Sequence, residues 1–201
     1  FLEKPNCAEV NTKNINAGVY VFDKRILSYI PRGKNYSLER GVFPNILEKG
    51  EKVMAYITDS YWIDIGTVEK YMQANFDILE KRFKVPIISP KTLRWNVKVG
   101  KKTDISLRAS LRGPIVIGDF CKIEKGIYNP LTIIGNHCEI EKDCVVERSI
   151  IWDNVKIGKS SVIKNSIIGK NCEIQSYVSL NGVILGDSTK ITHFSKLEGN
   201  L

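Results

Sequence analysis

The chain has 201 residues, of which 43% are apolar, so it can form one domain or two small ones around a buried core. Thirty Lys and Arg against 22 Asp and Glu give a net charge of +8, but the basic residues are scattered among acidic ones, which favours a solvated surface over a nucleic-acid interface. No stretch of about 18 uncharged apolar residues and no secretion signal are present, so we expect no membrane span and a cytoplasmic location.

The first 84 residues read as a mixed α/β segment. Residues 15–22, INAGVYVF, are rich in β-branched and aromatic side chains and predict a strand. Residues 37–50 predict a helical region that begins at the N-cap residue Ser37. Because Gly41 and Pro44 interrupt this region, we expect two short helical turns rather than one helix.

The rest of the first half ends in a helix and a linker. Residues 52–67 again have strand character, and residues 68–83 predict an amphipathic helix. Prolines then break the pattern, which predicts a linker over residues 85–98 between a domain of residues 1–84 and one of residues 99–201. The apolar stripe of the helix comprises Val68, Tyr71, Met72, Phe76 and Leu79.

From Val99 onward, apolar residues recur every six positions. From residue 117 the spacing settles to 6+6+5, and the column at 117, 134, 151, 168 and 185 reads Ile, Ile, Ile, Ile and Leu. Three short strands per coil, each directing an aliphatic side chain inward, predict a triangular parallel β-helix of hexapeptide repeats. Asn129 is expected to be the one polar residue in an inward slot.

Two further columns of the repeat suggest how the coils pack. The position after the aliphatic column reads Gly118, Gly135, Trp152, Gly169 and Gly186, which indicates a tight corner where a residue without Cβ fits most easily. The five cysteines form no CxxC pair, which argues against a disulfide framework or a zinc site. Cys7 has no assigned role, and four fall at small inward positions, where we expect buried core fillers: Cys121, Cys138, Cys144 and Cys172.

Four motifs in the first half carry a resemblance to a known family. FLEKP, NAGVYVF, SLERGVFPNIL and YWIDIGTVEKYMQANFDIL occur in this order and precede hexads such as IGDFCK and IGNHCE. Together they resemble the C-terminal part of a sugar-1-phosphate nucleotidyltransferase, or nucleotide-sugar pyrophosphorylase, over essentially the whole chain, and are most similar to mannose-1-phosphate guanylyltransferases. The resemblance implies an α/β fold, a partial nucleotidyltransferase domain, followed by a left-handed parallel β-helix.

The same resemblance implies a substrate site. Glu3 would accept hydrogen bonds from sugar hydroxyls, Lys4 would hold the sugar phosphate, Asn16 would bond a further hydroxyl, and Gly18 would let the sugar approach the backbone. Asp64 would be a ligand of Mg²⁺, which takes few carboxylates. Without the family, the first two residues could be an exposed turn pair, the next two could shape a turn, and the last could cap a helix, although Thr67 is better placed for the cap.

The family joins a nucleoside triphosphate to a sugar 1-phosphate and releases pyrophosphate, so the implied activity is this transfer, with GTP and mannose 1-phosphate preferred. In the family, a glycine-rich phosphate loop precedes the EKP motif, and no matching segment is present. We therefore expect the chain to lack the nucleotide-binding half and its catalytic residues, and to be inactive alone. The alternatives are a glucose-1-phosphate adenylyl- or thymidylyltransferase, or a non-catalytic regulatory or scaffold subunit. The residues that read the base would lie in the other half, so sugar and base stay open.

The predicted β-helix admits three roles. Its flat faces and open ends favour a homo-oligomer, whose number of subunits the sequence does not give. A site for a regulatory metabolite and an acyl-CoA-dependent transferase are the others. Acyl transfer needs a general base, usually His, and only His137 and His193 are available, neither beside a long loop.

Overall fold

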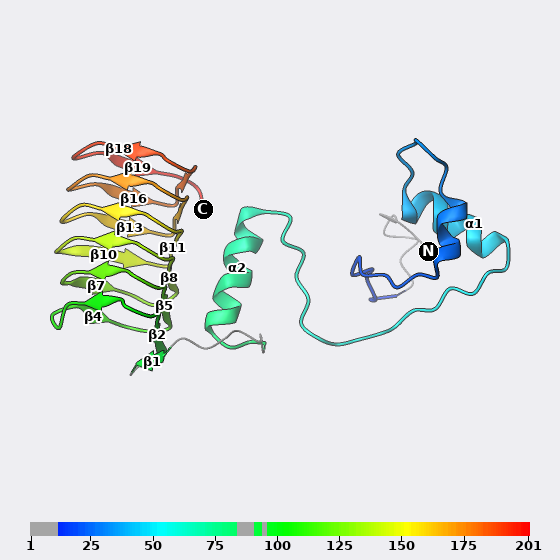
Figure 1. Ribbon diagram of the computed structural model, residues 1–201, viewed down its shortest axis with the longest axis horizontal. Helices are drawn as coiled ribbons and strands as arrows, with labels where there is room; N and C mark the ends of the chain where they lie inside the picture. The colour runs from blue at the N-terminus through cyan, green and yellow to red at the C-terminus, as the bar shows by residue number, and fades with distance from the viewer. Residues whose placement is uncertain (1–11, 84–90, 94–95) are drawn as a thin grey trace. The chain divides into compact units, whose positions relative to one another are not determined.

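The structure, a computed structural model, describes residues 12–83, 91–93 and 96–201 (Figure 1). It divides into two compact units, Phe1–Trp62 and Ile63–Leu201. Glu3, Lys4 and Cys7 lie outside the described residues. None of the described helices is long and apolar enough to cross a membrane.

The described residues of the first unit form three short helical segments: a 3₁₀ helix η2 (Lys24–Tyr29), a π-helical turn η3 (Leu38–Val42) and the helix α1 (Phe43–Glu48). The predicted N-cap is confirmed, because the Ser37 hydroxyl accepts from the Arg40 amide at 3.1 Å. The expected division into two helical pieces is also confirmed, with the π turn before the α-helix. The segments share a small core of Val42, Phe43 and Ile46, against which Tyr20, Ile26, Tyr29, Ile30 and Leu38 pack.

Neither strand expected in the first half forms in the structure. Residues 15–22 and 52–67 contain no assigned strand, and several of their apolar side chains are exposed, including Val21 at 99% and Tyr56 at 92%. A strand forms only when its amides and carbonyls pair with a second strand, and no described residue offers one. The expectation of paired strands was therefore wrong for the described residues.

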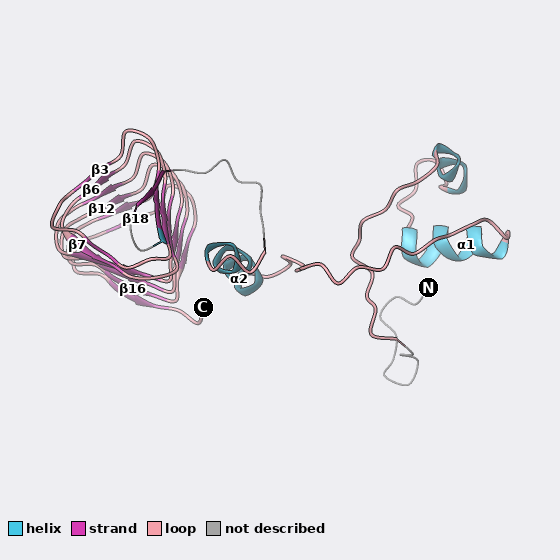
Figure 2. Ribbon diagram, turned by 90° about the horizontal axis from the view of Figure 1, so that it is seen from below, coloured by secondary structure: helices cyan, strands magenta, loops and turns pink. Residues whose placement is uncertain are grey.

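The second unit is a parallel β-helix of six coils, with a triangular cross-section that Figure 2 shows end on. Each coil contributes one strand to each of three sheets. The first sheet consists of β1 (Lys91–Leu93), β2 (Val97–Val99), β5 (Ile115–Ile117), β8 (Thr132–Ile134), β11 (Ile150–Ile151), β14 (Ile167–Ile168) and β17 (Ile184–Leu185). The second consists of β3 (Asp104–Ile105), β6 (Lys122–Ile123), β9 (Glu139–Ile140), β12 (Lys156–Ile157), β15 (Glu173–Ile174) and β18 (Lys190–Ile191). The third consists of β4 (Ser110–Leu111), β7 (Gly126–Tyr128), β10 (Cys144–Glu147), β13 (Val162–Lys164), β16 (Ser179–Asn181) and β19 (Lys196–Glu198).

The strands pair in parallel from coil to coil, with one exception. β1, which falls within the predicted linker, pairs antiparallel with β2, with Lys91 opposite Val99. β2 already contributes Val97 to the core at 1% exposure, so the first coil begins at the end of the segment predicted as a linker. The domain boundaries predicted from the sequence stay predictions.

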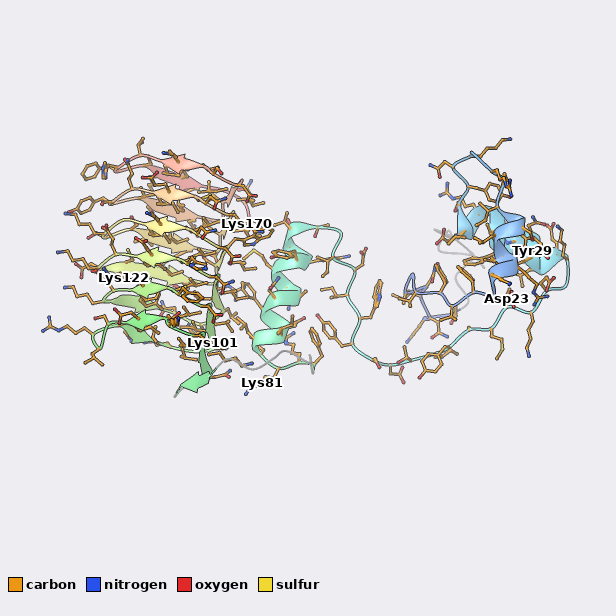
Figure 3. All side chains as sticks on the ribbon, in the orientation of Figure 1. Asp23, Tyr29, Lys81, Lys101, Lys122 and Lys170 are labelled. Carbon is orange, nitrogen blue, oxygen red and sulfur yellow. The ribbon has the colours of Figure 1, made fainter. Side chains whose placement is uncertain are left out.

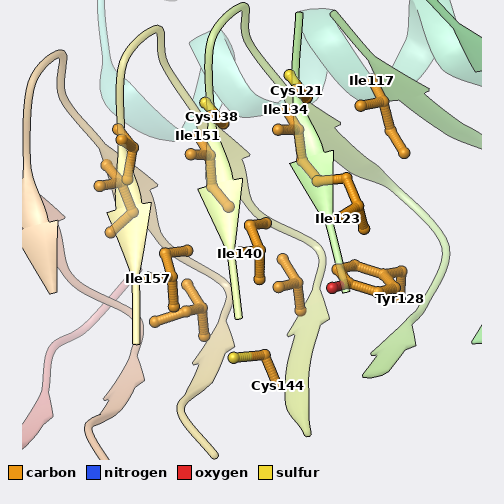
Figure 4. Packing of buried hydrophobic residues seen from close by; sticks show 14 of the residues in the cluster. Ile117, Cys121, Ile123, Tyr128, Ile134, Cys138, Ile140, Cys144, Ile151 and Ile157 are labelled. Atoms are coloured by element: carbon orange, nitrogen blue, oxygen red, sulfur yellow. The ribbon is translucent and has the colours of Figure 1, made fainter. Parts of the chain in front are cut away.

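The core is a set of aliphatic ladders, as the period predicts. Ile117, Ile134 and Ile151 stack on the first sheet, and Ile123, Ile140 and Ile157 stack on the second (Figure 4). The four cysteines predicted as core fillers are buried and unpaired with one another. Their thiols donate to a carbonyl of the next coil, at 3.0 to 3.3 Å, from Cys121 to Gly135, Cys138 to Trp152, Cys144 to Gly158 and Cys172 to Gly186.

One inward position differs from the prediction by a single residue. Tyr128, not Asn129, points into the core, where it is 0% exposed and its hydroxyl donates to the Glu124 carbonyl at 3.2 Å. Asn129 instead donates to the Glu147 carboxylate at 3.3 Å. The coil therefore runs 6+5+6 instead of 6+6+5, because the shorter side of the triangle lies one corner earlier here than in the later coils.

The glycine corner is explained by the next coil. A Cβ added to Gly118 would lie 2.6 Å from Asn136 Oδ1, and one added to Gly169 would lie 2.6 Å from Asp187 Oδ1. These Asn and Asp side chains reach toward the preceding coil and accept from its backbone amides, as Asn136 does from Asp119 at 2.8 Å. The corner glycines thus leave room for the Asn or Asp side chain of the following coil, which accepts from the backbone amide of the residue after the glycine.

Helix α2 (Val68–Leu79) lies along the outer face of the first sheet (Figure 1). Thr67 caps it, with its hydroxyl accepting from the Lys70 amide at 3.3 Å. The outward column of the sheet is apolar, so it gives the helix a surface to cover: Val116, Ile133, Ile150 and Ile167. Buried Met72, Phe76 and Leu79 pack there, and the Arg148 guanidinium lies 5.2 Å from the Phe76 ring centre. The helix predicted at residues 68–83 is confirmed, although it ends at Leu79, and it packs on the β-helix.

The outward column of the second sheet is an alternating ladder of charges. It reads Asp104, Lys122, Glu139, Lys156, Glu173 and Lys190, with each residue in register with the next. Lys190 lies 3.1 Å from Glu173, and Lys156 lies 4.0 Å from Glu139. Lys122, labelled in Figure 3, belongs to this ladder. Cross-strand pairs of opposite charge stabilise a sheet modestly and keep this face solvated.

Candidate functional site

The site predicted from the NAG motif is a turn that the structure describes. Asn16 Oδ1 accepts from the Gly18 amide at 3.0 Å, which is the local bond by which Asn favours turns. Gly18 has φ of +70°, a conformation that a residue without Cβ adopts at little cost. Apart from its chain neighbours, no atom of the described residues lies within 4 Å of where its Cβ would be, so among these residues its backbone is open to approach.

A chain of hydrogen bonds joins this turn to the SLER motif. Asn16 Nδ2 donates to the Tyr20 hydroxyl, which donates to Glu39 Oε1 at 2.9 Å. The Ser37 hydroxyl donates to the other carboxylate oxygen of Glu39 at 3.2 Å. Two motifs that lie about twenty residues apart in the sequence are therefore connected, and both polar atoms of the Asn16 amide are oriented.

The charges in this chain of bonds follow from the donors. The pKa of Glu39 is lowered, first by its own backbone amide and then by the Tyr20 hydroxyl, so the carboxylate is ionised at neutral pH. The pKa of Tyr20 is raised, mainly by burial, so its hydroxyl keeps the proton that it donates. Asn16 thus donates to a neutral phenol, which in turn donates to an ionised carboxylate. One amide N–H and one Oδ1 lone pair of Asn16 have no partner among the described residues.

A cavity of about 570 Å³ lies beside the turn. Asn16 and Tyr20 line it, but Phe43, Ile46 and Ile26 also line it, and these belong to the small core of the unit. Its cations, Arg25 and Lys52, come from separate segments, and Arg25 is already paired with Asp23 at 3.2 Å. Asp23 and Tyr29 are labelled in Figure 3. The polar turn at the edge of this cavity carries the residues predicted from the NAG motif, so the turn is the candidate site.

Asp64 lies in the second unit, four residues before α2, whereas Asn16 and Gly18 lie in the first unit. Its side chain is exposed, and Thr67 is the residue that caps the helix. Within residues 12–83 and the described part of the β-helix, no group of three His, Cys, Asp or Glu is arranged to hold a metal ion. One exposed carboxylate still fits Mg²⁺, which is commonly bound through one or two carboxylates with phosphates and water as its other ligands.

Neither histidine of the β-helix forms a catalytic arrangement. His137 stacks on Phe120 with ring centres 4.9 Å apart, and His193 Nδ1 accepts from the Ser176 amide at 3.1 Å. A general base needs an exposed acceptor nitrogen beside a substrate pocket. The acceptor of His193 is used within the fold, and neither ring lines the cavity beside the Asn16 turn or the one lined by Leu107, Arg108 and Lys142.

Sequence reasoning missed the part that Tyr20 and Glu39 play. Both residues stand inside motifs that carry the resemblance, but no role was assigned to them. A signal was available, because an acidic residue two positions after a helix N-cap Ser is close enough to share its hydroxyl, as Glu39 does with Ser37. The partner on the other segment depends on tertiary contact and was not predictable from spacing.

Two family descriptions match the chain. Residues 94–197 match "EIF2B subunit epsilon LbH domain", and residues 1–81 match "Nucleotidyl transferase". The boundary between the two matches thus falls close to the linker that the sequence predicts.

Curated relatives match about three fifths of the chain. A UTP–glucose-1-phosphate uridylyltransferase of Synechocystis sp. is 33% identical over 135 residues, which is 63% of this chain and 33% of that protein. A mannose-1-phosphate guanylyltransferase of Mycobacterium tuberculosis is 35% identical over 127 residues, 63% of this chain and 34% of that protein. A glucose-1-phosphate adenylyltransferase of Clostridium acetobutylicum is 28% identical over 131 residues, 59% of this chain and 34% of that protein. The chain spans about a third of the length of these relatives.

Proposed function

The chain belongs to the EIF2B subunit epsilon LbH domain family, here preceded by a segment of nucleotidyl transferase type, and from this premise we propose that its protein is a sugar-1-phosphate nucleotidyltransferase. In the proposed reaction, a phosphate oxygen of the sugar 1-phosphate attacks the α-phosphorus of a nucleoside triphosphate in line, and pyrophosphate leaves. Such catalysis consists mainly of positioning two polyanions and neutralising the charge between them.

We propose that this chain supplies the sugar side of the site. The observation that carries the proposal is the Asn16–Gly18 turn, whose amide is oriented by Tyr20 and Glu39. The free hydrogen-bonding positions of Asn16 would meet a sugar hydroxyl, and the open backbone at Gly18 would allow the ring to approach. Glu3 would accept from other hydroxyls and Lys4 would neutralise the sugar phosphate.

Asp64 is the residue that we propose for Mg²⁺. When bound, Mg²⁺ neutralises phosphate charge and polarises phosphoryl oxygens. The part of this chain is to present one exposed carboxylate ahead of α2, which stays available because Thr67 and not Asp64 caps that helix.

GTP and mannose 1-phosphate are the proposed substrates, since the motifs of the first half are most similar to mannose-1-phosphate guanylyltransferases and a relative of that name is 35% identical. The glucose-1-phosphate uridylyltransferase at 33% identity and the adenylyltransferase at 28% support glucose 1-phosphate as the next candidate. The sugars differ by single hydrogen bonds worth about 1 kcal/mol each, so an assay must decide.

The test is pyrophosphate release with Mg²⁺ across GTP, ATP, UTP and dTTP, each with mannose or glucose 1-phosphate. It is run on this chain and on a chain extended by a nucleotide-binding half of the family. We expect activity only in the extended chain, strongest with GTP and mannose 1-phosphate. Asn16→Ala should raise the KM for the sugar phosphate and leave that for the nucleotide unchanged, while Asn14→Ala, two residues earlier, should change neither. Turnover by the chain alone would contradict the expected division of the site.

A non-catalytic subunit is the second candidate, because the β-helix matches a domain described as part of a subunit. Absence of turnover in the extended chain, together with retained binding of sugar phosphate, would favour this role. In either case we propose a homo-oligomer assembled through the β-helix. For the enzyme we also propose a cytoplasmic location, as expected for chemistry on nucleoside triphosphates.

A further inference from the structure

The three outer faces of the β-helix are chemically different, and only one suits a partner. α2 covers the first sheet, and the second sheet carries its alternating ladder of charges. The outer face of the third sheet has an apolar centre, in which Ile127, Val145 and Val162 stand in register on β7, β10 and β13. Ile127 is 44% exposed, and no apolar cluster of the described residues joins this face to a helix.

Charged residues flank this apolar centre in a specific order. Glu147 on β10 is in register with Lys164 on β13, and Arg112 and Glu198 stand near the two ends of the same column. The centre of the sheet lies between β10 and β13, since two strands of the third sheet lie beyond each of them. Consider a two-fold axis through that point that lies in the plane of the face and runs along the strands. This axis reverses the order of the strands in the second copy, so β10 faces β13, β7 faces β16 and β4 faces β19.

We propose that the third sheet is the interface between two antiparallel copies of this chain, related by that axis. The axis brings Val145 of one copy against Val162 of the other, twice, which makes the apolar centre self-complementary. It also brings Glu147 opposite Lys164 and Arg112 opposite Glu198, so every charge in the column meets its opposite. This inference rests on the assembly proposed above, to which it gives a face and a geometry.

Charge alternation alone does not choose this face. The ladder of the second sheet is also complementary to itself under the same kind of axis, but its whole outward column is charged, so an interface there would desolvate charges on every strand. The third sheet has charges on its flank and valines at its centre, which is the usual arrangement of an interface with an apolar core and a polar rim.

The area of the face limits how much surface such a dimer can bury. Six strands at about 4.8 Å and a side of about five or six residues at 3.3 Å give roughly 500 Å² per copy, or about 1,000 Å² in total. That total is at the lower limit for a specific interface, so we expect a dimer that dissociates on dilution.

Sedimentation velocity of the full chain over about 1–500 μM tests the proposal, because this range brackets a micromolar dissociation constant. Glu147→Lys places two lysines opposite each other across the interface, and Lys164→Glu places two glutamates opposite each other, so each variant alone should weaken the dimer about tenfold or more. A mixture of the two variants should restore it, because a copy with Glu147→Lys then faces a copy with Lys164→Glu, and opposite charges meet at both positions. Mixing cannot restore a pair within one chain, so the Lys164–Glu147 contact at 3.5 Å inside each copy does not account for such a rescue.

The matched control is Lys156→Glu, the same charge reversal on the second sheet, which should leave the dimer unchanged. Circular dichroism confirms that each variant is folded, and Glu147→Gln and Lys164→Gln replace any reversal that is not, with weakening expected for each. A wild-type chain that is monomeric throughout would overturn both this interface and assembly through the β-helix. A wild-type dimer that the reversals leave intact, or a mixture that fails to restore it, would overturn this face while the proposed assembly stands.

Discussion

Gly135→Ala tests how the corner of the β-helix is built. A Cβ at this position would lie 2.8 Å from the Trp152 carbonyl carbon and still closer to the Asp153 carboxylate, both on the next coil. Gly186 occupies the same place in its own coil, and in the described part of the chain no atom beyond its neighbours lies within 4 Å of where its Cβ would be. The two substitutions are chemically identical and differ only in the coil that faces them.

We expect the two substitutions to change the free energy of unfolding in opposite directions. Overpacking against backbone costs about 1–3 kcal/mol, so Gly135→Ala should lower the melting temperature by about 2–12 °C. Neither glycine has a left-handed backbone, so Gly186→Ala should stabilise by about 0.4–1 kcal/mol through the unfolded chain. Thermal unfolding followed by far-UV circular dichroism measures both.

A second substitution should compensate in part for Gly135→Ala. Trp152 stands in the glycine column with a Cβ of its own, and the residue of the next coil that would reach toward it is Lys170 instead of Asp or Asn. Asp153→Lys should therefore reduce the cost of Gly135→Ala by about 1 kcal/mol in a double-mutant cycle, although it loses the bond from the Asn136 amide at 2.7 Å. Equal effects of alanine at both glycines, or an additive cycle, would refute this account of the corner.

Three further predictions concern packing and pH. Ile151→Ala removes a side chain that is 1% exposed and should cost about 2–5 kcal/mol in urea unfolding, whereas Ile184→Ala, at 52% exposure, should cost much less. Phe76→Ala should expose the α2 amides to hydrogen exchange and leave those of β8 and β11 protected, because the helix is held by its contact with the first sheet. Burial raises the pKa of Cys144 from 9.0 to about 11, so the stability contributed by the protonated thiol is complete below pH 9 and is lost as pH rises from 9 to about 11. Unfolding by urea at pH 8 to 11 should show a shallower loss in Cys144→Ala than in the wild type, and equal slopes would contradict the assignment.

The β-helix was predictable because its core residues recur at a fixed spacing in the sequence. Each inward aliphatic residue repeats in the next coil, so a single column of Ile predicts the stacking, and the small cysteines follow from the same count. The position of Tyr128 was not predictable, because a spacing of 17 does not say which side of the triangle is one residue shorter. The position of α2 was indicated by the sequence, because outward Ile residues precede the inward Ile residues of the first sheet. These outward residues form an apolar face that a helix can cover.

The candidate site was less predictable. The turn at Asn16 and Gly18 follows from residue type, and the cap at Ser37 follows from the helix that it begins. The bond from Tyr20 to Glu39 joins segments whose meeting depends on packing. The strands at residues 15–22 and 52–67 were not found because β-propensity reports a preference for a paired surface, and pairing requires a partner strand that local sequence does not provide.

Because charges alternate along the second sheet, the effect of removing coils depends on whether their number is odd or even. Removal of the coil that carries Glu139 would set Lys122 beside Lys156, and directly opposed like charges destabilise a sheet. Removal of two neighbouring coils, those of Glu139 and Lys156, would set Lys122 beside Glu173 and keep the alternation. The second sheet therefore accommodates a longer or shorter β-helix most easily when coils are gained or lost in pairs.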